Sequence, residues 1–193
     1  MEFKDLDNSL ITVGSPVEGG ACYVCFDTTK ELPTDATTKM STLAHFMSVG
    51  ELSENGYTEQ KSVESEVQKG WHGTNVAVVN KGESHKYKAE FLEVNRPAVA
   101  KLRHGIKNVE TDAATGALKH IKGKATGVEY VSLVFDELMS NGILCRTVVK
   151  EAAITSFDDV AHQKGAIMVY GMEFDAMDKD GFFDIYYAKP VTA

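Results

Sequence analysis

The chain has little of what builds a disulfide scaffold or a membrane span. Its 193 residues include four prolines and three cysteines, Cys22, Cys25 and Cys145. An odd, small number of cysteines argues against a disulfide framework, so we expect reduced, packed thiols. The start at Met1 lacks a basic region followed by an apolar run, and no stretch approaches membrane-spanning length. We therefore expect no signal peptide, no membrane partner and synthesis in a cytoplasm.

Positive charge is also scarce. The chain carries 20 Lys and Arg against 28 Asp and Glu, a formal net charge of -8. The basic residues are scattered, whereas a protein that grips nucleic acid needs them clustered. The balance argues against specific nucleic-acid binding, although a negative surface would let nucleic acid pass without sticking.

Motifs for catalysis, phosphate binding and metal binding are missing. The sequence has no GxSxG, no GxxxxGK[ST] and no HExxH, and its six histidines are dispersed. Cys22 and Cys25 have CxxC spacing, but on an extended strand a separation of three places them on opposite faces. The segment Asp175–Gly181 lacks the first Asp and last Glu of a calcium loop. We expect no enzyme, no cofactor and no metal; an enzyme assembled from distant groups is the minority alternative.

Strand patterns and turns are plentiful. A hydrophobic content of 43% and a charged content of 25%, with no dividing linker, predict one globular domain over residues 1–193. Asn141-Gly142 between two apolar flanks is the strongest hairpin signal. The remaining strand segments are predicted as follows: Leu10–Val13, Ala21–Phe26 opened by Gly19-Gly20, Ala117–Ile121, the flanks Val128–Leu138 and Ile143–Ile154, and a second hairpin of Met168–Asp175 and Phe182–Tyr187 around Lys179-Asp180-Gly181. Segments 30–40 and 108–116 are expected to be irregular.

A strand followed by a short helix is predicted in the middle of the chain. Tyr87, Ala89 and Phe91 share one face of the strand, which is the period-two pattern of a half-buried strand. The helix has Asn95 as its predicted N-cap and Gly105 as its stop. The whole pattern predicts a mainly-β fold, an antiparallel β-sandwich or barrel with one short flanking α-helix.

The segment Leu52–Gly73 is predicted to be a long acidic loop. It holds several glycines and little sustained apolar periodicity, so it cannot bury itself well alone. We expect the part over about 53–73 to be ordered against a neighbouring subunit. Trp71, the only tryptophan, either folds back on the core or anchors an interface, and the acidic run is either a solvated face or the lining of a negative surface. The candidates for contacts between subunits or rings are Glu54, Tyr57, Glu59, Glu64, Glu66 and Trp71.

Three patches of this sequence resemble the major tail proteins, or tail tube proteins, of long-tailed, siphovirus-type bacteriophages. They are Gly19–Val24 with Leu32–Thr38, then Val49–Tyr57, and finally Trp71 with the strand His85–Val94 and the segment Asn95–Gly105. In the second patch Asn55 stands where Asp is usual. The resemblance extends loosely over most of the chain and rests on the order and spacing of the patches.

The resemblance implies a structural virion protein with no catalytic residues. Its copies would form rings of six whose sheets join around a lumen, and the rings would stack into the tail tube through which DNA is ejected. The implied partners are further copies, the tape measure protein and the tail terminator and distal tail proteins, with assembly in the host cytoplasm and no appended immunoglobulin-like domain. Two alternatives are the inner tube of a contractile tail or secretion system and a monomeric small-ligand-binding β-barrel.

Overall fold

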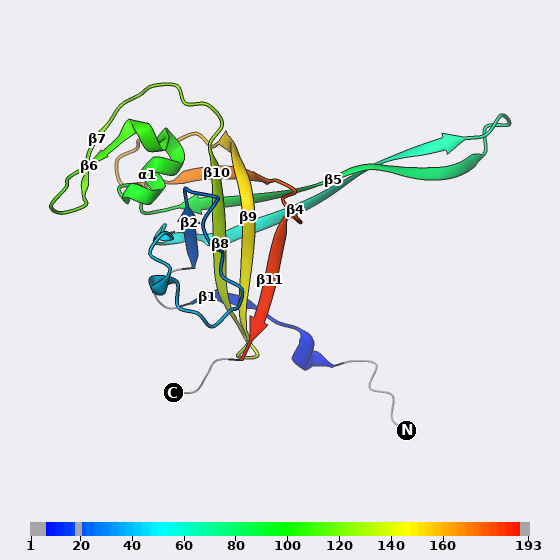
Figure 1. Ribbon diagram of the computed structural model, residues 1–193, viewed down its shortest axis with the longest axis horizontal. Coiled ribbons are helices and arrows are strands. Elements are labelled where there is room, and N and C mark those ends of the chain that lie inside the picture. Colours follow the sequence, from blue (N-terminus) through cyan, green and yellow to red (C-terminus); the bar gives the residue numbers. More distant parts are fainter. Residues whose placement is uncertain (1–6, 18–20, 190–193) are drawn as a thin grey trace.

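A long antiparallel hairpin, β8 with β9, is the centre of the structure (Figure 1). The computed structural model describes residues 7–17 and 21–189. The larger sheet has nine strands, and its main path runs β3-β2-β8-β9-β10-β5-β4. Its strands are β1 (Gly14–Pro16), β2 (Cys22–Cys25), β3 (Met47–Ser48), β4 (Leu52–Lys69), β5 (Asn75–Phe91), β8 (Tyr130–Met139), β9 (Leu144–Phe157), β10 (Tyr170–Ala176) and β11 (Phe183–Ala188). The prediction of a mainly-β, antiparallel fold with one helix is confirmed.

The turn between β8 and β9 explains why these two strands pair. The Gly142 amide donates to the Met139 carbonyl at 2.8 Å, and the Met139 amide donates to the Ile143 carbonyl at 2.8 Å. Gly142 has a φ of 78°, which favours glycine, whereas Asn141 is not in the left-handed region. The predicted hairpin is confirmed, with one positive φ in its Asn-Gly dipeptide where two were expected.

Each strand of the central hairpin carries two partners in succession along its outer edge. β1 and β2 both pair with β8, and β11 and β10 both pair with β9. The predicted second hairpin is therefore wrong, because β10 and β11 each pair with β9 and not with one another. β9 has 14 residues, which is long enough for both. The turn itself is present, with positive φ at Asp180 and Gly181.

The N-terminal part of the described chain also differs from expectation. A short 3-10 helix, Asn8–Leu10, precedes β1, so the strand predicted over Leu10–Val13 is wrong, and the strand begins only at Gly14. The prediction for Ala21–Phe26 is confirmed by β2. Gly19 and Gly20, which were expected to open that strand, lie outside the described residues. The segment 30–40 is irregular apart from the start of a second 3-10 helix, Met40–Thr42, as predicted.

The helix α1 (Pro97–His104) packs against one end of the sheet. Its buried residues are Ala98, Val99, Ala100 and Leu102. The N-cap is Arg96 and not Asn95, because Pro97 at the first helical position holds the preceding residue in an extended conformation, with ψ 131°. Gly105 ends the helix with φ 88°, as predicted.

A third 3-10 helix, Ile106–Asn108, and a two-stranded sheet follow α1. That sheet consists of β6 (Val109–Thr111) and β7 (Leu118–Ile121). β7 confirms the strand predicted there, whereas β6 lies inside the segment predicted to be a loop.

The main core lies between the larger sheet and α1, and aromatic rings fill much of it. Tyr57 stacks on Phe135 with ring centroids 4.0 Å apart. The ring of Tyr87 also stacks against Phe135, with 5.9 Å between the two centroids. Phe91 meets Phe174 edge to face at 6.4 Å. Aromatic pairs of this kind add to the free energy gained from burial. The core therefore fixes the root of β4 and β5 firmly to the body.

Candidate assembly surfaces

β4 and β5 form a hairpin that leaves the body of the molecule, as Figure 1 shows. We call its part over residues 58–86 the arm. At roughly 3.3 Å per residue, the strand from residue 58 to residue 69 extends about 40 Å. The prediction of a loop over 53–73 is wrong: most of that segment is one strand, paired almost throughout with β5. The sequence suggested a loop because the expected partner strand was taken to begin only at His85.

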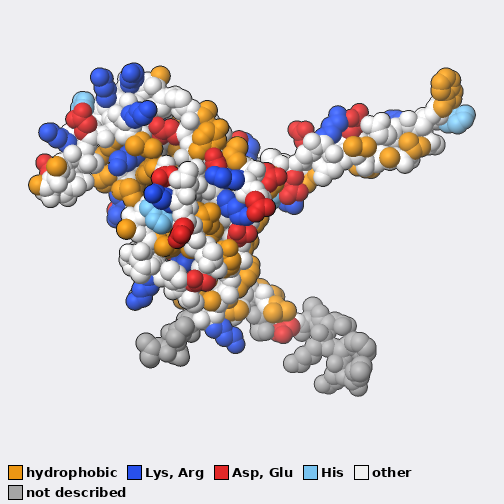
Figure 2. Space-filling view, in the orientation of Figure 1, with side chains coloured by type: hydrophobic (Ala, Val, Ile, Leu, Met, Phe, Trp, Pro, Cys, Tyr) orange, Lys and Arg blue, Asp and Glu red, His pale blue; other side chains and the backbone are white. Residues whose placement is uncertain are grey.

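The two faces of the arm differ in chemistry. Cross-strand pairs and alternation place three valines on the face that continues the core face of β5, and we call it the valine face. All three are exposed, by 44 to 68%, and Figure 2 shows hydrophobic side chains along the arm. They are Val63, Val67 and Val78. The opposite face carries Val79 together with Glu64 and Glu66, and the Glu66 carboxylate lies 2.5 Å from Lys81 Nζ.

A bulge inside β5 creates the valine face. Glu64 pairs with Gly82 but the next residue, Ser65, pairs with Asn80, so Lys81 is an extra residue on β5. An extra residue reverses the alternation of every side chain beyond it. Val78 therefore shares a face with Val63, although even-numbered residues nearer the body point away from the core. These valines could not be predicted to share a face, because no single period connects them in the sequence.

The tip of the arm presents its two bulkiest residues to solvent. The turn Gly70-Trp71-His72-Gly73 is closed by the Gly73 amide donating to the Gly70 carbonyl at 2.9 Å, with Gly73 at φ 77°. The Trp71 side chain is 100% exposed. Of the two expectations for Trp71, folding back on the core is therefore wrong. An exposed tryptophan on a protruding turn is typical of an interface anchor.

The root of the arm is held by an ion cluster around His85. Its Nε2 lies 2.7 Å from Glu83 Oε1 and its Nδ1 lies 3.3 Å from Glu59 Oε1. The ring is buried against Phe182 and Phe183. Lys61 and His85 both contact Glu83 and hold the pKa of that carboxyl below its usual value.

The six candidate contact residues are spread over β4 and the tip of the arm and do not form one cluster. Glu54 lies in a bulge before the arm, where residues 53–56 face Glu90 alone across the strand pair. Tyr57 stacks inside the subunit and its hydroxyl donates to Glu137 at 3.1 Å. Glu59 contacts His85, while Glu64 and Glu66 lie on the polar face and Trp71 lies at the tip.

Several strand edges are open. Within the described residues, β4 and β3 end the path of the sheet, β1 pairs only with β8, and β11 pairs only with β9. On β11 the side chains of Ile185 and Tyr187 are also exposed, Tyr187 by 61%. Unpaired edges of this kind are ready templates for strands of another chain.

The three thiols are packed inside the subunit. Cys22, Cys25 and Cys145 are free and buried, and burial raises the pKa of each thiol. No group of three or more His, Cys, Asp or Glu in residues 7–17 and 21–189 could hold a metal ion. In the same part of the chain, no helix has the length and apolar character needed to cross a membrane.

No protein-family model matches the chain, and no curated protein matches it. Among solved structures, the chain is similar to the tube terminating cap of the anti-feeding prophage, determined by cryo-EM. The identity is 11%, the alignment covers 97% of this chain and 100% of that one, and the TM-score is 0.40.

Proposed function

We propose that this protein is a structural subunit that assembles with copies of itself into stacked rings, forming a tube of the bacteriophage tail type. The observation that carries the proposal is the arm: about 40 Å of paired strand with an exposed valine face and a fully exposed Trp71. Apolar surface of this extent on a protrusion indicates a site for another protein. The resemblance of the three sequence patches to tail tube proteins is the reason for proposing stacked rings as the form of the assembly.

Two kinds of contact follow from the geometry. The open edges of β11, β1 and β4 can pair laterally with a neighbour, and lateral pairing that closes by rotation gives a ring. The arm leaves the body and can reach a copy outside that ring, which gives stacking without closure. Six subunits per ring, the tape measure and terminator partners, passage of DNA and a place in the virion all come from the resemblance and belong to the proposal.

The alternative of a monomeric ligand-binding barrel requires an enclosed apolar pocket. The structure has a hollow of about 740 Å³, but it is a surface groove beside β1. Its lining includes the four acidic residues Glu51, Glu54, Asp136 and Glu137. This lining fits a small apolar ligand poorly. The alternative of an inner tube in a contractile machine shares the architecture and differs in having a sheath on the outer face.

The test is the state of the purified chain as its concentration rises. Light scattering should report particles far above the subunit mass of 21.1 kDa, and negative-stain electron microscopy should show hollow rings or tubes. A strictly monomeric species at every protein and salt concentration would overturn the proposal. Rings that never stack would support the lateral contact and contradict the role given to the arm.

A further inference from the structure

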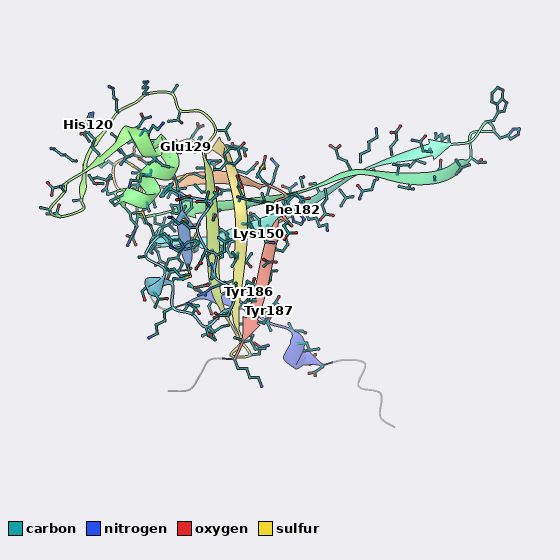
Figure 3. All side chains as sticks on the ribbon, viewed as in Figure 1. His120, Glu129, Lys150, Phe182, Tyr186 and Tyr187 are labelled. Atoms are coloured by element: carbon teal, nitrogen blue, oxygen red, sulfur yellow. The ribbon has the colours of Figure 1, made fainter. Side chains whose placement is uncertain are left out.

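A small hollow lies beside the C-terminal end of α1, far from the arm. Its volume is about 220 Å³, and Leu102, Ile154 and Phe157 supply its apolar walls. Arg103, Gly105 and residues 126–129 complete the lining of this hollow, which we call the Arg103 pocket. Figure 3 places Glu129 next to α1, at the opposite end of the molecule from the arm's tip.

Arg103 gives this pocket an aromatic and cationic wall. Its guanidinium carbon lies 4.7 Å from the centre of the Tyr170 ring and 5.6 Å from that of Phe157. Nη2 donates to the Asp158 carbonyl at 3.2 Å. Nη1 is buried and has no hydrogen-bond partner among the described residues. A stacked guanidinium beside an open apolar hollow is suited to an aromatic side chain.

The size of the pocket narrows the choice of occupant. Pockets that hold drug-sized ligands have volumes of about 300–1,000 Å³, so a hollow of 220 Å³ is suited to a single large side chain. Phe157 on its wall is itself 46% exposed, as is much of Val128 beside it. A partner that inserts one aromatic residue would cover both.

The arm's tip has the matching properties. Trp71 is fully exposed and can stack on Arg103 and Phe157. Its indole N–H needs an acceptor, which the Glu129 carboxylate in the pocket lining can provide. Lys69 lies two residues before the tryptophan, so a tip with a positive charge beside it meets a lining that carries the Glu129 carboxylate. Among the described backbone hydrogen bonds, none uses the carbonyl oxygens of Trp71 and His72, which leaves them as acceptors for a partner.

We propose that Trp71 of one copy inserts into the Arg103 pocket of the next copy along the tube. The inference rests on the proposed function, because it specifies the receptor for the arm. Because the tip and the pocket lie at opposite ends of the molecule, the contact is head to tail and gives the assembly a direction.

Trp71 is the only tryptophan of the chain, so its own fluorescence reports the contact. In the dispersed chain the emission should be that of a water-exposed indole, readily quenched by acrylamide. On assembly the emission should shift to shorter wavelength and the quenching constant should fall severalfold. Tubes in which Trp71 still emits at the wavelength of a water-exposed indole and is still readily quenched by acrylamide would overturn the inference. The proposed function would not be affected by that result. No particles at all would overturn both.

A matched pair of variants tests the pocket itself. Gly127 lines the pocket and Gly123 lies in the same connection outside it; a Cβ at either position meets nothing within 4 Å. Gly127→Phe should block stacking, while Gly123→Phe should assemble as the wild-type chain does. Trp71→Ala should weaken stacking about 30-fold, which corresponds to the roughly 2 kcal/mol of an interface hot spot.

Mixing the two defective chains gives the decisive readout. Trp71→Ala keeps an intact pocket and Gly127→Phe keeps an intact tip, so a mixture can form one type of contact and should yield paired assemblies that neither variant forms alone. Circular dichroism checks that each variant is folded. If both variants are folded and the mixture behaves like its separate components, or if Trp71→Ala stacks normally, the Arg103 pocket is not the receptor.

Discussion

Arg146 is the buried cation that ties the central hairpin to an irregular connection far away in sequence. Its Nε and Nη2 donate to the two carboxylate oxygens of Asp136 at 2.6 and 2.8 Å. Its Nη1 donates to the carbonyls of Asp35 and Thr38, both at 2.9 Å. Four of the five guanidinium N–H groups are therefore bonded, and a buried ion pair is tolerated when its remaining donors find partners in this way.

Removing one partner of this pair should be costly. We expect Arg146→Met to lower the free energy of unfolding by about 3 to 5 kcal/mol, because Asp136 stays buried without its partner. The double variant Arg146→Met with Asp136→Leu should recover part of that loss. Urea denaturation measures both. A loss below about 1 kcal/mol, as for a surface pair, would contradict this account.

Asp35 organises the same connection through its side chain. Its carboxylate accepts hydrogen bonds from the amides of Thr37 and Thr38, both at 2.6 Å, and from their hydroxyls at 2.9 and 2.6 Å. These bonds favour the charged form and hold the pKa of Asp35 well below its ordinary value. The stabilisation is therefore complete above the unfolded pKa of about 3.9 and is lost as the pH falls below it.

The prediction for Asp35 is a pH-dependent stability difference. Asp35→Ala should be less stable than the wild-type chain at pH 7, and the gap should narrow as the pH is lowered from about 5 to 2. Thermal unfolding at a series of pH values measures it. Asp159→Ala, at an exposed carboxylate, is the control and should show no such narrowing. A gap that stays constant with pH would mean that the Asp35 charge does not matter.

For single residues, the sequence predicted correctly on which face of a strand a side chain lies, because alternation along the strand alone determines this. Cys22 and Cys25 were expected on opposite faces of a strand, and they lie in two separate hydrophobic clusters. The N-cap of α1 was misplaced by one residue because the conformation imposed by Pro97 outweighs the capping preference of Asn95. The Arg146 network and the Arg103 pocket were not predictable, because each joins residues far apart in sequence.

The arm is the element in which sequence and structure differ most. Its outer strand was read as a loop because exposed valines and glutamates mix along it, and because its partner strand, in which Lys81 interrupts the alternation, was expected to begin only at His85. Only the pairing with β5 brings Val67 opposite Val78 and Gln68 opposite Ala77. These two cross-strand pairs lie on opposite faces, next to one another, and so form a natural test of which face is used.

We expect the valine face, and not its reverse, to be needed for stacking. Val67→Lys with Val78→Glu places a charge pair on the valine face, and Gln68→Lys with Ala77→Glu places the same pair on the other face. In both double variants the two new charges are opposite and face each other across the strand pair, so the hairpin can still form. The first variant should stop tube growth and the second should not, as measured by light scattering. Equal behaviour of the two would show that the valine face is not a contact surface.

At the scale of the whole molecule, the topology of the strands was only partly predictable. Local turns such as Asn141-Gly142 predicted the β8–β9 hairpin, since its residues are close in sequence. The placement of β10 and β11 in succession along β9 depends on the length of β9 and on β5 pairing with the outer edge of β10. Competition between strands that are distant in sequence produces no local sequence pattern. The turn at Asp180 was therefore predicted correctly, whereas the strands with which β10 and β11 pair were not.

A subunit with a body but no arm should act as a terminator of growth. Replacing residues 64–82 by Asn-Gly joins Val63 to Glu83, which are cross-strand partners, and keeps Lys61, Glu83 and His85 at the root. The shortened chain retains every lateral edge except that of the arm itself, so it should enter rings but offer no arm to the next ring. Added to the full chain in increasing proportion, it should shorten the tubes seen by negative-stain electron microscopy, whereas an equal addition of the Gln68→Lys, Ala77→Glu chain should not. Tube length that does not depend on the shortened chain would show that the arm is dispensable, and a shortened chain that fails to fold would show that the paired strands beyond the root also stabilise the body.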